Sequence, residues 1–275
     1  FFSAFRHCSF ELSTGVAMNF LAADIVERFY TFLWPMLRIS ALMITAPIFS
    51  LSAFNTRLRI LLALVLTWLV YPLHTWPVVD PTSAKGLVEV FNQIMIGATM
   101  GLILQVVVGA VVVAGQSIAA AMGLSMANMI DPNMGNVPTI SQLLIVMSTL
   151  IFVGFGGHAI MLGLILESFH SLPIGTSIMN QAVYGRVLQW SSMVFLGAVL
   201  MALPVMVALL FINVGLGVVT RAAPSLNIFA VGFPAMIMAG FVILIISMDS
   251  IGGRINWLWV QGFSVVREVL GVSRV

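Results

Sequence analysis

Few side chains in this sequence are suited to acid–base chemistry, and they lie inside or beside long apolar stretches. They are Arg38, Glu89, His158, Glu167 and Asp249. A charged group inside a membrane is costly and by default marks function. Glu167 lies near the end of its stretch, beside His170, where an interfacial pair is more frequent than a proton relay. We therefore predict a structural pair there, with the relay as the open alternative.

His158 and Arg38 have different structural alternatives. His158 follows the break from Gly154 to Gly157, where its imidazole could meet backbone carbonyls. No acidic residue stands one helical turn away from it, so we favour this structural role over proton transfer. Arg38 must extend its guanidinium to the membrane surface or find a partner, and the sequence does not name one.

The motifs of known enzyme classes are missing. His158 and Glu167 lack the His-Glu-x-x-His spacing of zinc hydrolases, and the single cysteine, Cys8, supports neither a disulfide nor a zinc cluster. The segment from Gly123 to Ala127 resembles a nucleophile elbow but lacks its last glycine and the preceding strand. No phosphate-binding Gly-x-x-x-x-Gly-Lys-Ser/Thr motif is present. We expect no enzyme, cofactor or metal site.

The segment from Gly123 to Pro138 joins helix breakers, methionines and one acidic residue between two apolar stretches. Irregular backbone at membrane depth must be covered by protein or face a water-filled path, so the segment predicts part of a pore or gate. Its thioethers suit a flexible seal or a core filler, and Asp131 suits a turn or a pore lining. The candidate gate residues are Met126, Asn128, Met129, Ile130, Asp131, Pro132, Asn133, Met134, Val137 and Pro138.

The elements that must position these residues are membrane helices. Hydrophobic residues make up 61% of the chain and charged residues only 7%, against about 25% charged residues in a soluble domain. Mean hydropathy is +1.13, and the net charge of +2 is too small to predict nucleic-acid binding. We predict an all-α polytopic membrane protein with about six spans, at residues 29–54, 60–76, 87–122, 140–167, 187–219 and 228–248.

Two of these spans are too long for one upright crossing. Residues 87–122 would form a helix of roughly 54 Å, against a hydrocarbon core of about 30 Å. This span must tilt, kink, turn back as a hairpin or leave the bilayer. Residues 187–219 are similar and contain Pro204, which can kink a helix. Such a long apolar surface predicts cover by other subunits.

The ends of the chain allow two further expectations. If the spans alternate simply, most basic residues outside them share one side with both termini, which the positive-inside rule places in the cytoplasm. Residues 1–17 have an ordinary soluble composition without a signal-peptide pattern, and Met18 begins a short amphipathic lead. We expect residues 1–17 to be a non-native or mis-started leader and residues 18–275 to form a single membrane domain.

Small residues recur at helical spacing in the third apolar stretch. Gly97, Gly101, Gly115 and Gly123 are the members of this set that we predict to pack helices together. Glycine allows the close backbone contact that membrane helices use. We favour packing within the chain over packing between subunits.

Several motifs together resemble the FliR family of export-gate membrane proteins. They are Ala119–Pro132, Gln142–Leu144, Gly157–His158, Glu167–Phe169 with Pro173, Thr220–Phe229 and Gly232–Pro234. The string Arg-Ala-Ala-Pro-Ser-Leu-Asn-Ile-Phe, beginning at Arg221, is the most specific of them. Ser225 departs from the glutamine expected there, which leaves only that side chain's role open. The resemblance runs from about Met18 to the end of the chain.

The resemblance implies a hetero-oligomeric channel built with FliP and FliQ, next to FlhB and FlhA, in the bacterial inner membrane at the flagellar basal body. Unfolded flagellar subunits would pass through it, and membrane lipid would surround it. The loop from Met126 to Pro138 would plug the closed pore. Structural or partner-docking roles are implied for Arg221, Pro224, Asn227, Phe229, Gly232 and Pro234.

Two alternatives stay open at this point. Relatives of this family also serve virulence-type secretion, and only overall likeness favours the flagellar system. A secondary transporter of small solutes would likewise use broken helices with irregular backbone. The absence of a convincing internal repeat and the few intramembrane charges count against a transporter.

Overall fold

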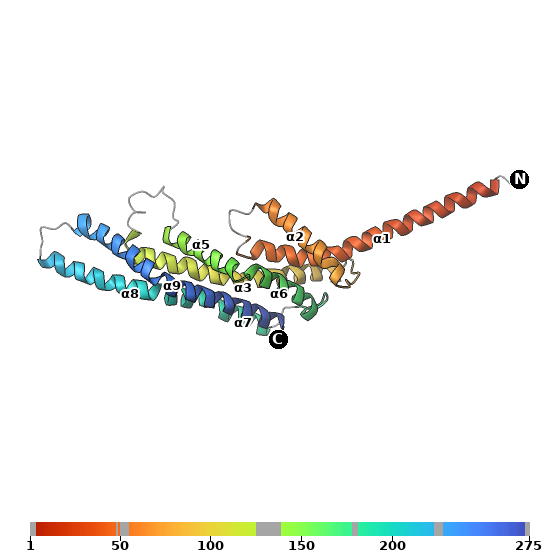
Figure 1. Ribbon diagram of the computed structural model, residues 1–275. Coiled ribbons are helices and arrows are strands. Elements are labelled where there is room, and N and C mark those ends of the chain that lie inside the picture. Colours follow the sequence, from red (N-terminus) through yellow and green to blue (C-terminus); the bar gives the residue numbers. More distant parts are fainter. Residues whose placement is uncertain are drawn as a thin grey trace. The chain divides into compact units, whose positions relative to one another are not determined.

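The computed structural model describes residues 4–47, 49, 55–124, 139–177, 181–222 and 228–272, with side chains except at residues 4–23 and 228–231. Helices and no strand make up the regular structure of this part of the chain, which confirms the all-α class. The elements, labelled in Figure 1, are α1 (Ala4–Thr45), α2 (Thr56–Val70), η1 (Tyr71–Leu73), α3 (Ala84–Ala121), α5 (Thr139–Gly154), α6 (Gly157–Ser171), α7 (Gln181–Ser191), α8 (Met193–Ala222) and α9 (Ile228–Leu270).

The described helices confirm a polytopic membrane protein. Four stretches are long and apolar enough to cross a membrane, and a fifth is added if the bent pair of α5 and α6 is one span. The predicted span at 29–54 is not among them. Its helix, α1, ends at Thr45 and carries Arg38 seven residues before that end. The total of about six spans therefore stays a prediction.

One predicted boundary was wrong. The last span was expected to end at residue 248, before Asp249, but α9 continues to Leu270. The reason is a buried stripe at helical spacing that continues past Asp249 and comprises Ile251, Ile255, Leu258 and Val266. The charges lie on the opposite, exposed side of the helix, where Asp249 and Arg254 are found.

The predicted overlong span is one unbroken helix. α3 has 38 residues and is about 57 Å long at 1.5 Å per residue. A hairpin within this stretch is therefore excluded, which leaves a tilt, a kink or departure from the bilayer. α8 likewise contains Pro204 within its helix, and the helical path from α7 to α8 is interrupted at Ser192.

The first of two compact units contains α1, α2, the part of α3 up to Thr99, and residues 172–178. α1 packs along α2, and Trp34 and Leu42 of α1 are fully buried. Gly97 of α3 lies directly against the backbone of Arg38 and the side chain of Ala41, so this glycine packs within the chain.

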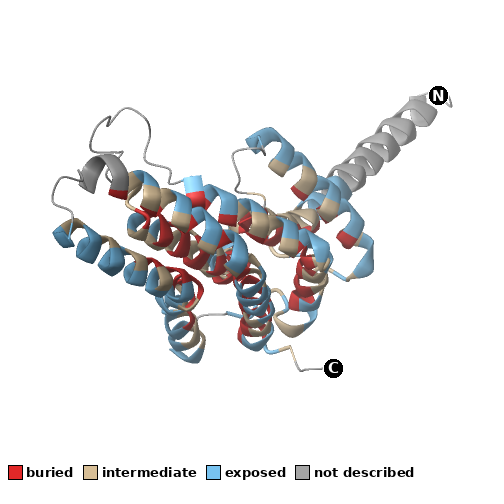
Figure 2. Ribbon diagram, turned by 60° about the vertical axis from the view of Figure 1, so that its left-hand side comes forward, coloured by how far each residue is buried: buried red, intermediate tan, exposed pale blue. Residues whose placement is uncertain are grey.

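The second unit contains α3 from Met100 onward, with α5, α6, α7, α8 and α9. α8 and α9 pack against each other (Figure 1). The buried face of α3 carries Ile103, Val107, Val111 and Ile118, and buried residues in red line the inner faces of the helices in Figure 2. The Trp190 indole of α7 donates a hydrogen bond to the Ile103 carbonyl, 2.9 Å away.

Candidate functional site

The predicted gate loop leaves α3 at a glycine with a left-handed backbone. Gly123 has φ +82°, and its N–H donates to the Ala120 carbonyl at 3.0 Å. Glycine adopts this conformation without steric cost and so ends the helix. The candidate gate residues, Met126 to Pro138, lie outside the described residues. The structure describes the two stems from which they extend.

The first stem is packed against α9. Met122 has no exposed surface, and its Sδ lies 2.9 Å from where a β-carbon on Gly240 would stand. The ring of Phe233 lies 3.5 Å from the β-carbon position of Gly123. This contact places the ring of Phe233 beside the start of the gate loop.

The second stem is tied to α3. Ser141, two residues after the start of α5, is 2% exposed, and its hydroxyl donates to the Val112 carbonyl at 3.1 Å. The backbone of Ser141 also lies directly against Gly115. Both ends of the loop are therefore held by buried contacts within one unit. Gly101, which the sequence also predicts to pack helices together, is buried in α3.

We expect Gly115→Ala to destabilise the protein, because its β-carbon would overlap the Ser141 backbone and force α3 away from α5. Overpacking of this kind costs about 1–3 kcal/mol. Thermal unfolding of the purified protein measures the loss. Gly163→Ala in α6 is the matched control, since no atom lies within 4 Å of its β-carbon position. Equal stability of the two variants would contradict close packing of Gly115 against the Ser141 backbone.

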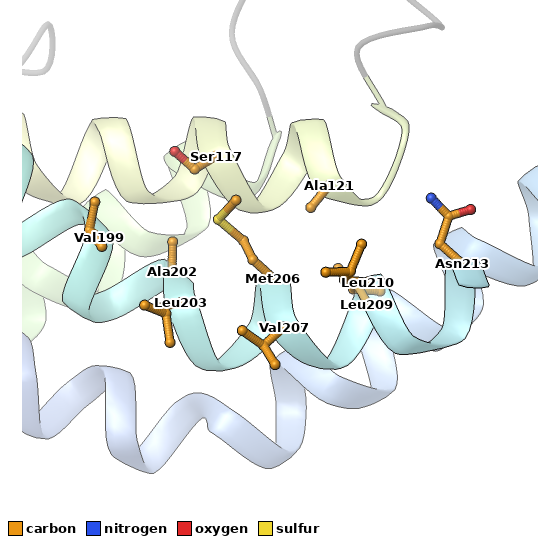
Figure 3. A pocket seen from close by; sticks show the side chains of 10 residues that line it. All are labelled: Ser117, Ala121, Val199, Ala202, Leu203, Met206, Val207, Leu209, Leu210 and Asn213. Carbon is orange, nitrogen blue, oxygen red and sulfur yellow. The ribbon is translucent and has the colours of Figure 1, made fainter. Parts of the chain in front are cut away.

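An apolar cleft of about 450 Å³ lies between the C-terminal part of α3 and the middle of α8. Figure 3 shows Met206 of α8 directed toward α3, near Ser117, and Asn213 at one end of the cleft. The other lining residues are Ala121, Val199, Ala202, Leu203, Val207, Leu209 and Leu210. With no acid, base or thiol among them, this cleft is suited to apolar packing and not to catalysis.

Arg38 has partners, so its guanidinium does not need to reach the membrane surface. The side chain is fully buried, and its Nε donates to Oε1 of Gln93 at 2.7 Å. Its Nη2 donates to the Leu172 carbonyl at 2.8 Å. The Gln93 amide in turn donates to Glu89, which is 5% exposed. Gln93 therefore links a buried cation to a buried carboxylate.

The same cluster includes Asn92, which extends it to the segment after α6. The Asn92 amide donates to Glu89 Oε2 at 3.5 Å, and its Oδ1 accepts from the Ser177 hydroxyl at 3.4 Å. The sequence signal for this cluster was the spacing of Glu89, Asn92 and Gln93, three and four residues apart in an apolar run. That spacing puts them on one helix face, which marks a polar stripe able to receive a buried cation such as Arg38.

His158 and Glu167 lie on α6, after a 64° bend between α5 and α6. The break expected between Gly154 and Gly157 is present, with Phe155 and Gly156 outside both helices. Both ionisable side chains are exposed, and within the described residues His158 makes no hydrogen bond to a backbone carbonyl. The pairing of Glu167 with His170 stays a prediction.

The residues predicted to have structural or docking roles are only partly described. Arg221 is exposed in the last turn of α8, and Pro234 is exposed within α9. Gly232 is buried. Pro224 and Asn227 lie outside the described residues, and for Phe229 the structure describes the backbone alone, in the first turn of α9.

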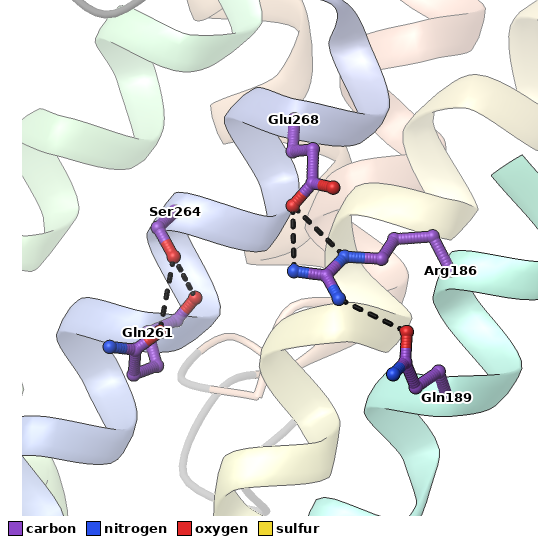
Figure 4. Close-up of polar contacts among 5 residues, drawn as sticks. All are labelled: Arg186, Gln189, Gln261, Ser264 and Glu268. Atoms are coloured by element: carbon purple, nitrogen blue, oxygen red, sulfur yellow. Dashed lines mark hydrogen bonds and ion pairs between the residues drawn. The ribbon is translucent and has the colours of Figure 1, made fainter.

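A surface ion pair joins α7 to α9 (Figure 4). Nη2 of Arg186 lies 2.7 Å from Oε2 of Glu268, and Nη1 of Arg186 donates to Gln189 at 3.2 Å. The two charged side chains are 38% and 57% exposed. Exposed pairs contribute little to stability, so we assign this pair no functional role.

The connection between α2 and α3 contains one carboxyl group whose pKa is shifted. The backbone N–H of Thr82 donates to Oδ1 of Asp80 at 2.9 Å, and the Thr82 hydroxyl donates to the same oxygen at 2.7 Å. These bonds lower the pKa of Asp80 below its usual value. The stabilisation is present at neutral pH and is lost as the pH falls through that lowered pKa.

A metal ion in a protein is held by several ligating side chains that lie close together. In the part of the chain that the structure describes, no group of three or more His, Cys, Asp or Glu side chains is arranged to hold a metal ion.

Comparisons with known proteins agree on one family. The family model described as bacterial export proteins, family 1, matches residues 29–261. A flagellar biosynthetic protein FliR of Pectobacterium carotovorum subsp. carotovorum is 34% identical over 257 residues, which are 92% of this chain and 97% of the relative. The proteins of that name from Escherichia coli K12 and Bacillus subtilis 168 are 32% and 30% identical, over 87% and 91% of this chain and 92% and 94% of the relatives.

Proposed function

The chain belongs to the family of bacterial export proteins, family 1, and from this membership we propose that it acts as a membrane subunit of the flagellar protein export apparatus. The observation that carries the proposal is the similarity over nearly the whole chain to proteins named for flagellar biosynthesis. Those names favour the flagellar system over virulence-type secretion. The location that follows is the bacterial inner membrane, at the flagellar basal body.

In this role the chain would join FliP and FliQ to form a closed channel for unfolded flagellar subunits, with FlhB and FlhA as neighbours. Exposed apolar surface on helices longer than the bilayer supports the proposal. On α8, Phe195 is 71% exposed and Phe211 is 73% exposed. α9 has 43 residues, about 65 Å of helix against about 30 Å of hydrocarbon. Partner subunits would cover the apolar helix surface that lies outside the lipid.

Residues 126–138 would plug this channel. The buried stems support the assignment, because Met122 and Ser141 hold both ends of the loop in a packed unit. Two anchored ends would hold the loop at a fixed place in the channel. The loop's methionines would supply a seal that adapts to different cargo.

Co-expression with FliP and FliQ tests the proposal. The complex would be purified from membranes and weighed intact by native mass spectrometry. A stable hetero-oligomer that contains this chain is the expected result. A well-behaved monomer or homodimer that ignores both partners would overturn the proposal and favour a small-solute transporter.

We expect Arg221→Ala to lower the yield of that complex without opening a leak. Arg221 is exposed at the end of α8, and truncating an arginine at a partner contact weakens binding on the order of tenfold. Complex yield and ion leakage would be measured together. Arg57→Ala, at an exposed position at the start of α2, is the control. Normal yield for Arg221→Ala would argue against a docking role.

A further inference from the structure

The helix of α2 and η1 differs from the other candidate spans in length. It runs from Thr56 to Leu73, 18 residues, or about 27 Å if all are counted as α-helical, which is close to the hydrocarbon core of about 30 Å. The other single candidate spans have 38 to 42 residues. Its outward side is apolar, with Leu61, Val65 and Leu69 each more than half exposed. By length and surface, this helix is suited to contact with lipid.

The C-terminal end of this helix carries aromatic side chains. Trp68 is 79% exposed. Tyr71 stacks on Trp76, with ring centroids 6.5 Å apart, and the Trp76 indole donates to the Tyr71 carbonyl at 2.8 Å. The Tyr71 hydroxyl is hydrogen bonded to the Thr31 hydroxyl of α1 at 2.9 Å. Tyrosine and tryptophan concentrate at the headgroup level of a bilayer.

A hollow of about 510 Å³ opens at this end of the α1–α2 pair. Its walls are Phe29, Phe32, Trp68, Tyr71 and Pro72, and its single charged lining residue is Arg28. Arg28 is exposed and has no ion pair among the described residues. The acidic neighbours on α1, Asp24 and Glu27, do not line the hollow. An apolar hollow with one cation among its lining residues is suited to a ligand that joins an anionic headgroup to an acyl chain.

We propose that this hollow binds an anionic phospholipid, with an acyl chain against Phe29, Phe32 and Trp68 and the phosphate at the Arg28 guanidinium. Arginine presents paired N–H donors that match two phosphate oxygens. The bilayer-length helix and the aromatic side chains at its C-terminal end, Trp68, Tyr71 and Trp76, favour lipid over a partner helix as the occupant. The site lies within one unit and does not depend on the export function.

Native mass spectrometry of the intact complex in detergent tests the proposal. The probes are phosphatidylglycerol and phosphatidylcholine with identical acyl chains, titrated separately. The variants are Arg28→Gln, Trp68→Ala and, as the matched control, Arg57→Gln at the other end of α2. If this chain forms no complex, the same titration is made on the full chain alone, so a failed complex and a failed lipid site give different results.

The wild-type protein should retain phosphatidylglycerol about fivefold more tightly than phosphatidylcholine, the effect of about one favourable charge at a membrane surface. Arg28→Gln should abolish this difference, Trp68→Ala should weaken both lipids, and Arg57→Gln should change neither. Any of three results would overturn the proposal. The wild-type protein could retain both lipids equally, the two arginine variants could lose equal amounts of phosphatidylglycerol, or no lipid could be retained because a partner covers Trp68.

Discussion

Arg38→Leu is expected to remove most of the folded protein from the membrane. The substitution leaves the Glu89 carboxylate buried without its cation and removes the bonds to Gln93 and the Leu172 carbonyl. Breaking a buried charge pair by removing one partner costs about 3–5 kcal/mol, a large part of the stability of an ordinary domain. The amount of chain in the membrane and the unfolding temperature of the purified protein measure the effect.

A second substitution separates the charge effect from the loss of packing. Glu89→Gln in the Arg38→Leu background removes the uncompensated carboxylate, so the double variant should regain part of the lost stability. Recovery stays incomplete because the Gln93 oxygen and the Leu172 carbonyl still lack their donor. Arg57→Leu, at an exposed site, is the control. Wild-type stability in Arg38→Leu would show that the buried cluster does not hold the unit together.

Replacing Met126 to Met134 with a shorter glycine segment is expected to make the membrane leak ions and small solutes while the complex still assembles. This prediction depends on the proposed plug. Assembly should survive because the stem residues Met122, Gly123 and Ser141 are unchanged, and their contacts with α9 and α3 lie outside the replaced segment. Ion leakage through membranes that contain the full complex is the measurement, alongside complex yield and export.

The control for this experiment is a glycine replacement of Pro77 and Val78 in the exposed connection between α2 and α3. That variant should neither leak nor lose export. An unchanged leak with normal export in the loop variant would rule out the plug assignment. Leakage in both variants would point to general damage of the membrane protein instead.

The agreement between sequence and structure is best where the signal is local. The break before His158 follows from three glycines within four residues, Gly154, Gly156 and Gly157, and it is present in the structure. The close approach at Gly97 and Gly115 likewise follows from glycine within a long apolar helix. The last span does not end before Asp249, because the helix exposes this carboxylate and continues to Leu270.

The sequence by itself determined the all-α membrane class, the family and the break before His158, because composition, motifs and helix breakers are properties of neighbouring residues. Tertiary structure alone decided what Arg38 contacts, since Gln93 and Leu172 are 55 and 134 positions away. It also decided that Met122 packs at Gly240. The physical reason is that a buried polar or bulky group is stabilised by whichever distant segment folding brings beside it, and apolar periodicity does not encode that choice.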